Sequence, residues 1–457
     1  MKRFFILLIA LGLSANMVYP GGIMTNTNQS TSYIRMLARD ASLGIDAAYY
    51  NPAGLTRLAD GFHFSLNNQS VFQNRSIRND LATLNQNEFK GKVTAPLFPS
   101  VYAAYKTGKL AFSFGFNPVG GGGGAVYEDG LPSFEAGVSS LVPMLSDFGV
   151  TGYRNDIYFE GSSIFFGGQL GVSYVINDMF SLFGGARYVV ASNTYEGYLR
   201  DIEVDTPVGW MKPGTYLRAV VGPNLPGSMQ PLIEATADAL DEFTADAEVD
   251  VAQKGNAITP LIGLSITPND RFNIGIKYEF LTKLELENET EIDGTGMFPD
   301  RAKTRNDMPA LISVGAAYKA TSQLNISGGV HYYFDKAADY GKPLPNEDLM
   351  DNNYLEVALG LEYGLTDDIL VSAGYLRTQT GVNEEYHSDM SHSLSTNSLG
   401  FGGRYAINEM IAVNLGFLMT SYEEDSRSYD YDDPLGTATE TYNRDNMVFA
   451  IGLDFKF

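Results

Sequence analysis

Residues 271–287 read RFNIGIKYEFLTKLELE and decide the fold class. One face of this segment carries Phe272, Ile274, Ile276, Tyr278, Phe280, Leu284 and Leu286. The other face carries Asn273, Gly275, Lys277, Glu279, Lys283, Glu285 and Glu287. A period of two is typical of a β-strand, and this run is much longer than the usual strand of about 5–6 residues.

The C-terminal residues 447–457 repeat the pattern with a different second face. Large apolar side chains alternate there with glycine, alanine and charged residues. A soluble sandwich would bury the apolar face and present mostly polar groups to water, whereas a small and polar second face suits the crowded or wet lumen of a barrel. The chain ends on Phe457, and an aromatic end of this kind is common in outer-membrane barrels.

Alternation of this kind recurs along the whole chain, and the linkers have a rhythm. We expect strands at 62–73, 99–106, 109–117, 162–176, 179–198, 257–267, 270–287, 309–319, 322–335, 353–364, 367–380, 393–406, 409–422 and 444–457. Tight turns rich in Gly, Asn, Asp or Ser alternate strictly with long polar connections. This predicts an all-β fold, a fourteen-stranded antiparallel transmembrane β-barrel with both termini on the periplasmic side.

Composition excludes several classes of function. The chain has no cysteine, so it can form no disulfide and no thiolate metal site. Its formal net charge of −23 excludes nucleic acid as a partner. Met1-Lys2-Arg3 and the apolar run that follows have the order of a secretory signal, which we place at residues 1–20 with cleavage between 14 and 21.

Three segments lie outside the expected strands. Residues 21–60 do not alternate, and their length suits a plug inside the lumen of a barrel that spans 61–457. Residues 118–161 and 199–256 form long outer loops in which apolar residues recur at helical spacing. These include Phe134, Val138, Leu141, Leu240 and Phe243. Such helices either offer an apolar landing surface for a ligand or pack on each other, and both can hold.

Three short stretches resemble a known family. Ala47-Ala48-Tyr49-Tyr50-Asn51-Pro52-Ala53-Gly54-Leu55 precedes the first strand. Pro99–Tyr105 leads into Phe112–Gly115, and Met308-Pro309-Ala310 leads into Gly315–Tyr318. With the other features, these stretches resemble the long-chain fatty acid outer-membrane transporters, a family that also includes channels for aromatic hydrocarbons.

The resemblance implies a barrel plugged by its N-terminal segment. It implies that a hydrophobic ligand is captured at the two helical loops, passed to a lumen site, and released sideways beside a kinked third strand when the plug shifts. Asn51, Pro52, Ala53 and Gly54 are then plug elements, although Asn-Pro is also a plain turn former. Gly115 and Pro118 should bend or break the third strand, because proline cannot donate to the ladder. The Gly120–Gly124 run is either part of that gate or a flexible loop.

A carboxylate head group inside the barrel would need a cation or hydrogen-bond donors. Alternation directs five candidate side chains toward the lumen: Arg187, Lys277, Lys283, His331 and Arg404. Each of them can instead pair with a lumen acid such as Glu279, Glu285, Glu356 or Glu362. His387, Asp389 and His392 share an outer loop and could bind a cation, although such loops are usually just solvated.

The predicted function is passive uptake of long-chain fatty acids or similar hydrophobic molecules across the outer membrane. We expect a monomer that contacts the lipid bilayer and the outer-leaflet lipid, with no cofactor, no metal and no catalytic residue. No G-x-S-x-G motif occurs, which argues against a lipase. The plug-length N-terminus argues against an open porin. A transporter of aromatic hydrocarbons and a surface-binding, adhesin-like barrel remain as alternatives.

Overall fold

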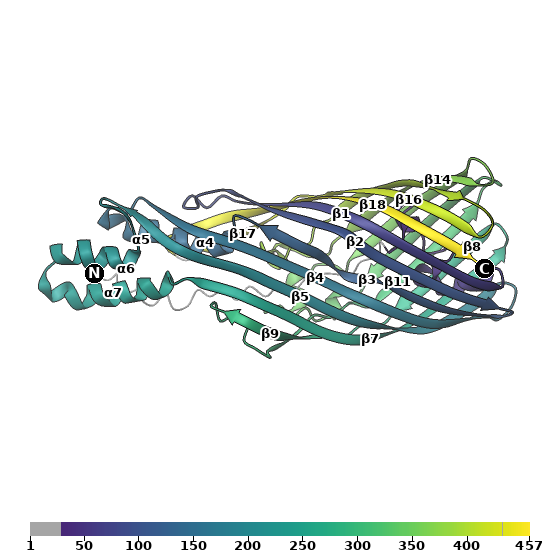
Figure 1. The fold of residues 1–457 in the computed structure, drawn as a ribbon, viewed down its shortest axis with the longest axis horizontal. Coiled ribbons are helices and arrows are strands. Elements are labelled where there is room, and N and C mark those ends of the chain that lie inside the picture. The colour runs from purple at the N-terminus through teal and green to yellow at the C-terminus, as the bar shows by residue number, and fades with distance from the viewer. Residues whose placement is uncertain (1–28, 432) are drawn as a thin grey trace.

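The structure is a computed structural model that describes residues 29–431 and 433–457. The predicted signal peptide and the first residues of the predicted plug lie outside the described residues. The chain forms one closed antiparallel sheet drawn out along a single axis (Figure 1). Its named strands make up a 14-stranded barrel wall, because β8/β9, β10/β11 and β16/β17 are each one interrupted wall strand and β6 is a short outer hairpin arm.

The strands run over β1 Gly61–Asn79, β2 Glu88–Thr107, β3 Leu110–Tyr127, β4 Gly152–Val175, β5 Phe180–Thr206, β6 Gly209–Met211, β7 Ala247–Asn269, β8 Phe272–Glu279, β9 Glu285–Asp293, β10 Lys303–Arg305, β11 Leu311–Lys319, β12 Leu324–Tyr333, β13 Leu355–Gly364, β14 Ile369–Gln379, β15 Thr396–Ala406, β16 Ile411–Tyr422, β17 Asp425–Tyr431 and β18 Gly436–Lys456. The helices before the barrel are α2 Thr31–Ile34, α3 Ala47–Tyr50 and η1 Pro52–Arg57. Helices between strands are α4 Pro132–Ser139, α5 Leu141–Leu145, η2 Ser146–Phe148, α6 Pro213–Tyr216, η3 Leu217–Val221, η4 Gly222–Asn224, η5 Gly227–Met229, α7 Gln230–Phe243, η6 Asp335–Ala337, α8 Asn346–Leu349 and η7 Glu384–Tyr386.

The first and last strands close the barrel. β1 pairs with β18 in register from His63–Lys456 to Asn79–Glu440. The backbone N–H of Phe457 donates to the carbonyl of Phe62 at 2.8 Å, and the N–H of Phe62 donates in return at 3.1 Å. Short turns join strands at this same end of the barrel, which we take as the periplasmic end (Figure 1). The predicted fold class is therefore confirmed.

Several strands are longer than predicted, so the outer loops are shorter. β3 continues through Pro118 and the glycine run to Tyr127, and β4 already begins at Gly152. The loop predicted at 118–161 is thus confined to 128–151, and that at 199–256 to 207–246, which includes β6. The reason is that these strand extensions stand beyond the bilayer, where neither face needs to be apolar and the period-two signal fades.

The wall strand predicted at 270–287 is interrupted. β8 ends at Glu279 and β9 begins at Glu285, and the residues between them leave the regular ladder. Asn273, Gly275, Lys277 and Glu279 face the lumen, whereas Thr282, Leu284 and Leu286 are the buried residues further on. The irregular segment therefore exchanges the two faces. Lys283, predicted to point into the lumen, is exposed instead, and this prediction is wrong.

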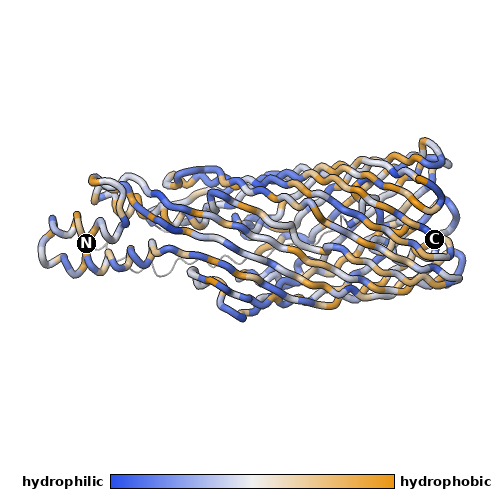
Figure 2. Tube along the Cα trace, viewed as in Figure 1, coloured by the Kyte–Doolittle hydropathy of each residue, from blue (hydrophilic) through white to orange (hydrophobic). Residues whose placement is uncertain are grey.

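A band of exposed apolar side chains surrounds the barrel. Members from different parts of the wall include Leu66 on β1 at 45% exposed, Leu170 on β4 at 65% and Leu359 on β13 at 53%. Figure 2 shows hydrophobic residues most densely along the part of the barrel that ends at the C-terminus, while the opposite, outer extension of the wall is more hydrophilic. A contiguous apolar band of this extent is what a lipid-facing surface requires. No helix among the described residues is long and apolar enough to cross a membrane.

Candidate functional site

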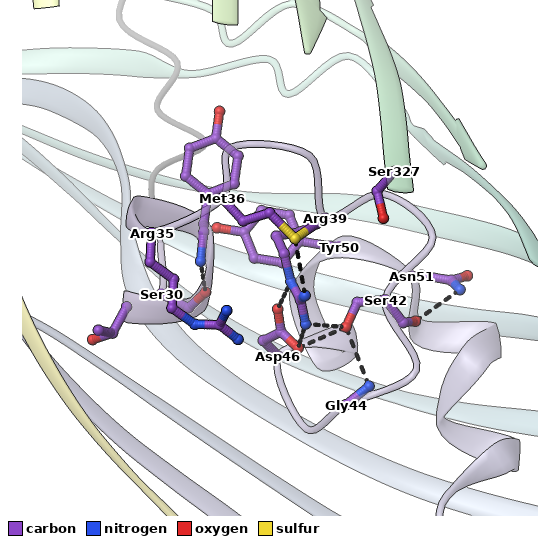
Figure 3. A network of polar contacts seen from close by, with 12 residues as sticks. Ser30, Arg35, Met36, Arg39, Ser42, Gly44, Asp46, Tyr50, Asn51 and Ser327 are labelled. Carbon is purple, nitrogen blue, oxygen red and sulfur yellow. Dashed lines mark hydrogen bonds and ion pairs between the residues drawn. The ribbon is translucent and has the colours of Figure 1, made fainter. Parts of the chain in front are cut away.

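The described part of the N-terminal segment, residues 29–60, fills the periplasmic half of the lumen. Its helices α2, α3 and η1 pack against the inner faces of strands around the barrel, and most of its side chains are buried. Within the segment, the Arg39 guanidinium donates to both oxygens of Asp46 at 2.7 and 2.9 Å and to Ser42 Oγ at 2.8 Å (Figure 3). This segment is called the plug below.

Glycines on the inner wall make room for the plug. A side chain at any of these positions would stand within 4 Å of plug atoms: Gly275, Gly315, Gly329, Gly360, Gly374, Gly400, Gly402, Gly416 and Gly452. At Gly374 even a methyl group would overlap the carbonyl of Met36. The small inner face that the sequence displays is therefore needed for close approach of two backbones.

The Asn51–Gly54 stretch lies where the plug meets β4. The Asn51 side chain donates to the carbonyl of Ser42 at 3.0 Å (Figure 3). The Pro52 carbonyl accepts from Ser173 Oγ at 2.7 Å, and Ala53 packs fully buried against Phe183. Gly54 faces Asn51 so closely that a Cβ would collide with it. The stretch thus forms a turn that is also bonded to the wall.

Two of the predicted head-group cations are bound in a buried ion network. Arg187 on β5 donates to the Glu279 carboxylate at 2.5 and 3.1 Å, and Lys277 Nζ lies 2.7 Å from the same carboxylate. Lys277 also donates to the carbonyl of Tyr49 in the plug at 2.8 Å. Both cations lie over the Tyr49 ring, at 5.1 and 4.4 Å from its centroid. We call this group of four residues the tyrosine latch.

His331 forms a second link between wall and plug. Its Nε2 lies 2.7 Å from Asp40 in the plug, and its Nδ1 lies 2.7 Å from Glu356 on β13. Further round the barrel, Arg35 of the plug donates to Glu362 at 2.7 Å. Lys277 and His331 therefore bond directly to the plug, and Arg187 lies over the Tyr49 ring of the plug.

Arg404 lies apart from these links. It is partly exposed and lines a second cavity of about 580 Å³ at the periplasmic end, between plug residues 36–44 and the short turns. The structure thus places Arg187, Lys277 and His331 against the plug, Arg404 below it, and Lys283 outside the barrel.

A cavity of about 430 Å³ lies above the plug in the outer half of the lumen. Tyr33 and Leu37 of the plug form its floor, and residues 389–394 of the loop between β14 and β15 contribute to its outer end. Apolar side chains from opposite walls, among them Phe159, Leu376 and Leu418, line its sides. A space of this kind suits a hydrophobic ligand.

The barrel wall beside this cavity has an interrupted ladder. β2 and β3 pair from Thr107–Leu110 to Val101–Phe116 and again at Lys92–Val126 and Gly91–Tyr127, with no pairing between. The pairing of β3 with β4 also shifts register twice, at Pro118/Gly120 and at Gly120/Gly123. The strand thus bends where proline and glycine predict it, but it does not end. We call the unpaired stretch, 93–100 opposite 117–125, the gap.

The cavity reaches the gap. Ala95, Leu97 and Phe98 from β2 and Gly121, Gly123 and Ala125 from β3 all line it. Leu97 is 75% exposed, so its side chain also faces the outside of the barrel. Parting two strands elsewhere in the wall breaks ladder hydrogen bonds worth about 1 kcal/mol each, whereas here there are none to break.

The outer-loop helices pack mainly on each other. Val138, Leu141 and Leu240 are 2%, 0% and 1% exposed and belong to one apolar cluster that joins the two loops. Phe243 packs at the edge of this cluster, and Phe134 packs on Phe159 at the cavity end. Of the two alternatives, mutual packing describes this state, and the buried side chains offer no landing surface in it.

Sequence reasoning missed two arginines and two prolines. Arg75 and Arg444 line the cavity but fall outside or at the end of the predicted strands. Pro96 and Pro99, with no N–H to donate, lie on the β2 side of the gap, and their presence in the sequence could have predicted it.

His387 and His392 of the loop between β14 and β15 are buried, not solvated. In the described part of the chain, no group of three or more His, Cys, Asp or Glu could hold a metal ion.

These features define a class: a plugged, fourteen-stranded β-barrel of the bacterial outer-membrane type with a lumen cavity and an interrupted wall. No protein-family model and no curated protein matches the sequence. Solved structures do match. A FadL homologue from Pseudomonas aeruginosa is 15% identical, with a TM-score of 0.66 over 95% of this chain and 100% of that one.

Two toluene transporters match as well. TodX from P. putida is 15% identical with a TM-score of 0.57, over 91% of this chain and 94% of that one. TbuX from Ralstonia pickettii is 17% identical with a TM-score of 0.55 and the same coverage. The chain therefore has the fold of the FadL/TodX channels, and the resemblance read from its sequence is confirmed at the level of the fold.

Proposed function

We propose that this protein is a channel for passive uptake of long-chain fatty acids or similar hydrophobic molecules across the outer membrane. The observation that carries the proposal is the cavity above the plug, which apolar and polar side chains line together and which extends to the gap between β2 and β3. A ligand collects in this cavity and leaves sideways through the gap into the membrane. The fold shared with a FadL homologue and with toluene transporters supports the same class of cargo.

A sideways route has a physical advantage over an axial one. An apolar chain that crossed to the periplasm through water would expose its methylene groups at about 0.8 kcal/mol each. Release through the wall keeps the chain out of water, because the apolar surface of the barrel begins at the gap itself. The plug then needs to yield only enough to free the floor of the cavity.

Closing the gap with a disulfide should stop uptake. The Cβ position of Gly123 lies 3.9 Å from that of Ala95 across the gap, within the usual disulfide spacing of about 3.5–4.5 Å. The chain has no cysteine, so Ala95→Cys/Gly123→Cys provides the only thiols. We expect the oxidised protein to lose fatty-acid uptake in cells lacking other transporters, and the reduced protein to regain it.

A crosslink between strands that are already paired serves as the control. Asn74 and Asp445 face each other on the outside of β1 and β18, with side chains 3.0 Å apart. Oxidised Asn74→Cys/Asp445→Cys should transport normally. If the oxidised gap variant also transports normally, release does not pass between β2 and β3.

The cargo itself can be identified without a transport assay. Protein extracted in a mild detergent should release fatty acids that mass spectrometry detects and that added oleate displaces. Recovery of aromatic hydrocarbons instead would favour the cargo of the toluene transporters. A protein that carries neither and ignores oleate would favour the surface-binding alternative.

A further inference from the structure

Four adjacent strands place a row of residues along the outer edge of the gap. Arg444 on β18 pairs in register with Arg75 on β1, Arg75 pairs with Gly91 on β2, and Gly91 pairs with Tyr127 on β3. Gly91 has no side chain, and the Tyr127 ring occupies the space above it, so the ring leans toward the two arginines. Arg75, Arg444 and Tyr127 all line the cavity.

This row is rich in donors that lack acceptors. Neither Arg75 nor Arg444 forms an ion pair with any carboxylate in the described residues. Arg75 Nε donates to the neutral Gln73 at 2.8 Å, and the Arg444 guanidinium stacks over Tyr422 at 5.3 Å. Arg444 Nε and the Tyr127 hydroxyl are buried without a hydrogen-bond partner, which is costly unless a ligand supplies one.

His392 adds a neutral imidazole with an unpartnered ring nitrogen at the outer side of the row. It lines the cavity, stacks on Tyr442 at 4.9 Å, and its buried Nε2 has no partner. Burial, followed by the charges of Arg444 and Arg75, holds the pKa of His392 well below its usual range. The positive charges of the two arginines therefore reach this histidine, and no nearby acid offsets them. Such a locally positive site stands out in a chain whose net charge is −23.

The acids that line the same cavity are already engaged. The Asp389 carboxylate accepts from the backbone N–H groups of Ser133 and Met390, each at 2.8 Å. Glu356 accepts from Thr378 and Tyr333 and contacts His331. Neither carboxylate is available to neutralise the arginine pair.

The row also has a defined height in the wall. On the outer surface, Asn74 and Asp445 lie at the level of the two arginines, and both are polar. One step toward the periplasm, Phe72 and Met447 are exposed and begin the apolar band. The gap starts directly below the row, where β2–β3 pairing ends after Lys92. An anion at the row would thus stand at the polar edge of the bilayer, with the gap at the level of the acyl chains.

We propose that Arg75, Arg444, Tyr127 and His392 form a binding site for an oxyanion, and that the ligand is a single-chain amphiphile whose head group binds there while its tail enters the gap. The ligand then leaves the barrel tail first. In the bound state its head group already lies at the polar edge of the bilayer and its tail at the level of the acyl chains, as in the membrane itself. This inference rests on the proposed function, because it assumes that the cavity holds the transported molecule. Carboxylate, sulfonate and phosphate heads share the required chemistry.

Calorimetry in detergent with oleate and oleyl alcohol tests the site, because the two molecules share one chain and differ in charge. Wild-type protein should bind oleate more tightly than the alcohol. Arg75→Gln/Arg444→Gln should weaken oleate about 10- to 100-fold and leave the alcohol unchanged, since hydrogen bonds to charged groups are the ones removed. Octadecyl sulfonate and octadecyl phosphate then rank the head groups.

Arg78→Gln is the matched control. Arg78 is on the same strand, but its side chain is 65% exposed, outside the cavity. It should bind oleate as the wild type does. If wild-type protein binds both ligands equally, or if the double variant weakens both alike, the oxyanion site is refuted while the channel stands. If wild-type protein binds neither ligand, the proposed function itself fails.

A labelling experiment tests which end of the bound ligand lies in the gap. In the cysteine-free chain, Leu97→Cys and Tyr127→Cys each introduce a single thiol, one in the gap and one in the row. A fatty acid with a maleimide at its tail should label the Leu97→Cys protein at least about tenfold faster than the Tyr127→Cys protein, after correction for their reactivity with free maleimide. The reverse preference would refute tail-first release.

Discussion

Replacing Gly374 with valine should expel the plug from its seat. The inner face of β14 touches the plug backbone at this glycine, and any Cβ would overlap the Met36 carbonyl. Backbone cannot yield as a flexible side chain can, so we expect overpacking to cost about 1–3 kcal/mol. This cost shifts the equilibrium constant between the seated and the released plug about 5- to 150-fold. We expect a marked rise in single-channel leak conductance in planar bilayers, with the barrel itself intact.

Gly328→Val is the control, because it makes the same substitution at a glycine that does not contact the plug. Gly328 is on β12, and its nearest neighbour, the carbonyl of Ala358, lies 3.6 Å from the Cβ position, which is ordinary contact. Its neighbour Gly329 faces the Asp40 side chain of the plug, which can yield more easily than backbone, so Gly329→Val should have a smaller effect than Gly374→Val. Equal conductance for Gly328→Val and Gly374→Val would mean that the plug does not close the pore.

The barrel could be predicted from sequence because its signals are local. Alternation of side chains and the rhythm of short and long linkers each depend on neighbours in the chain. The arrangement of Lys277 and Glu279 on one inner face followed from the same alternation. Their partner Tyr49 did not, because it belongs to a plug without periodicity and meets β8 only in the folded molecule.

The prediction failed where the backbone departs from regular geometry. Between Glu279 and Glu285 the chain leaves the ladder. Side-chain alternation, the only guide to which face a residue belongs to, is lost there. Arg75 was missed for a related reason, since the strand expected at 62–73 continues to Asn79 and has three further inward positions. Val71, Gln73, Arg75 and Ile77 continue its period, but polar residues on both faces hid the continuation. A strand that rises beyond the bilayer gives little sequence signal.

Glu279→Gln should release the tyrosine latch and have the largest effect of any single charge removed from the lumen. Glu279 is the only carboxylate that forms an ion pair with Arg187 or Lys277 among the described residues, and side chains of all three are nearly fully buried. Without it, two adjacent buried cations repel each other over the Tyr49 ring. Removing one partner of a buried pair costs about 3–5 kcal/mol. We expect a lower unfolding temperature and a higher leak conductance.

Two variants separate charge from packing in this result. Glu285→Gln removes an acid from the exposed pair with Lys303, where both side chains are more than half exposed, and should change stability by less than about 1 kcal/mol. Adding Lys277→Met to Glu279→Gln removes one of the two opposed cations and should restore part of the lost stability. If the double variant is no more stable than Glu279→Gln alone, repulsion between the cations is not what loosens the plug. If Glu279→Gln leaves conductance unchanged while Gly374→Val raises it, the plug is held by its fit to the glycine-lined wall, and the latch contributes only to the rigidity of the barrel.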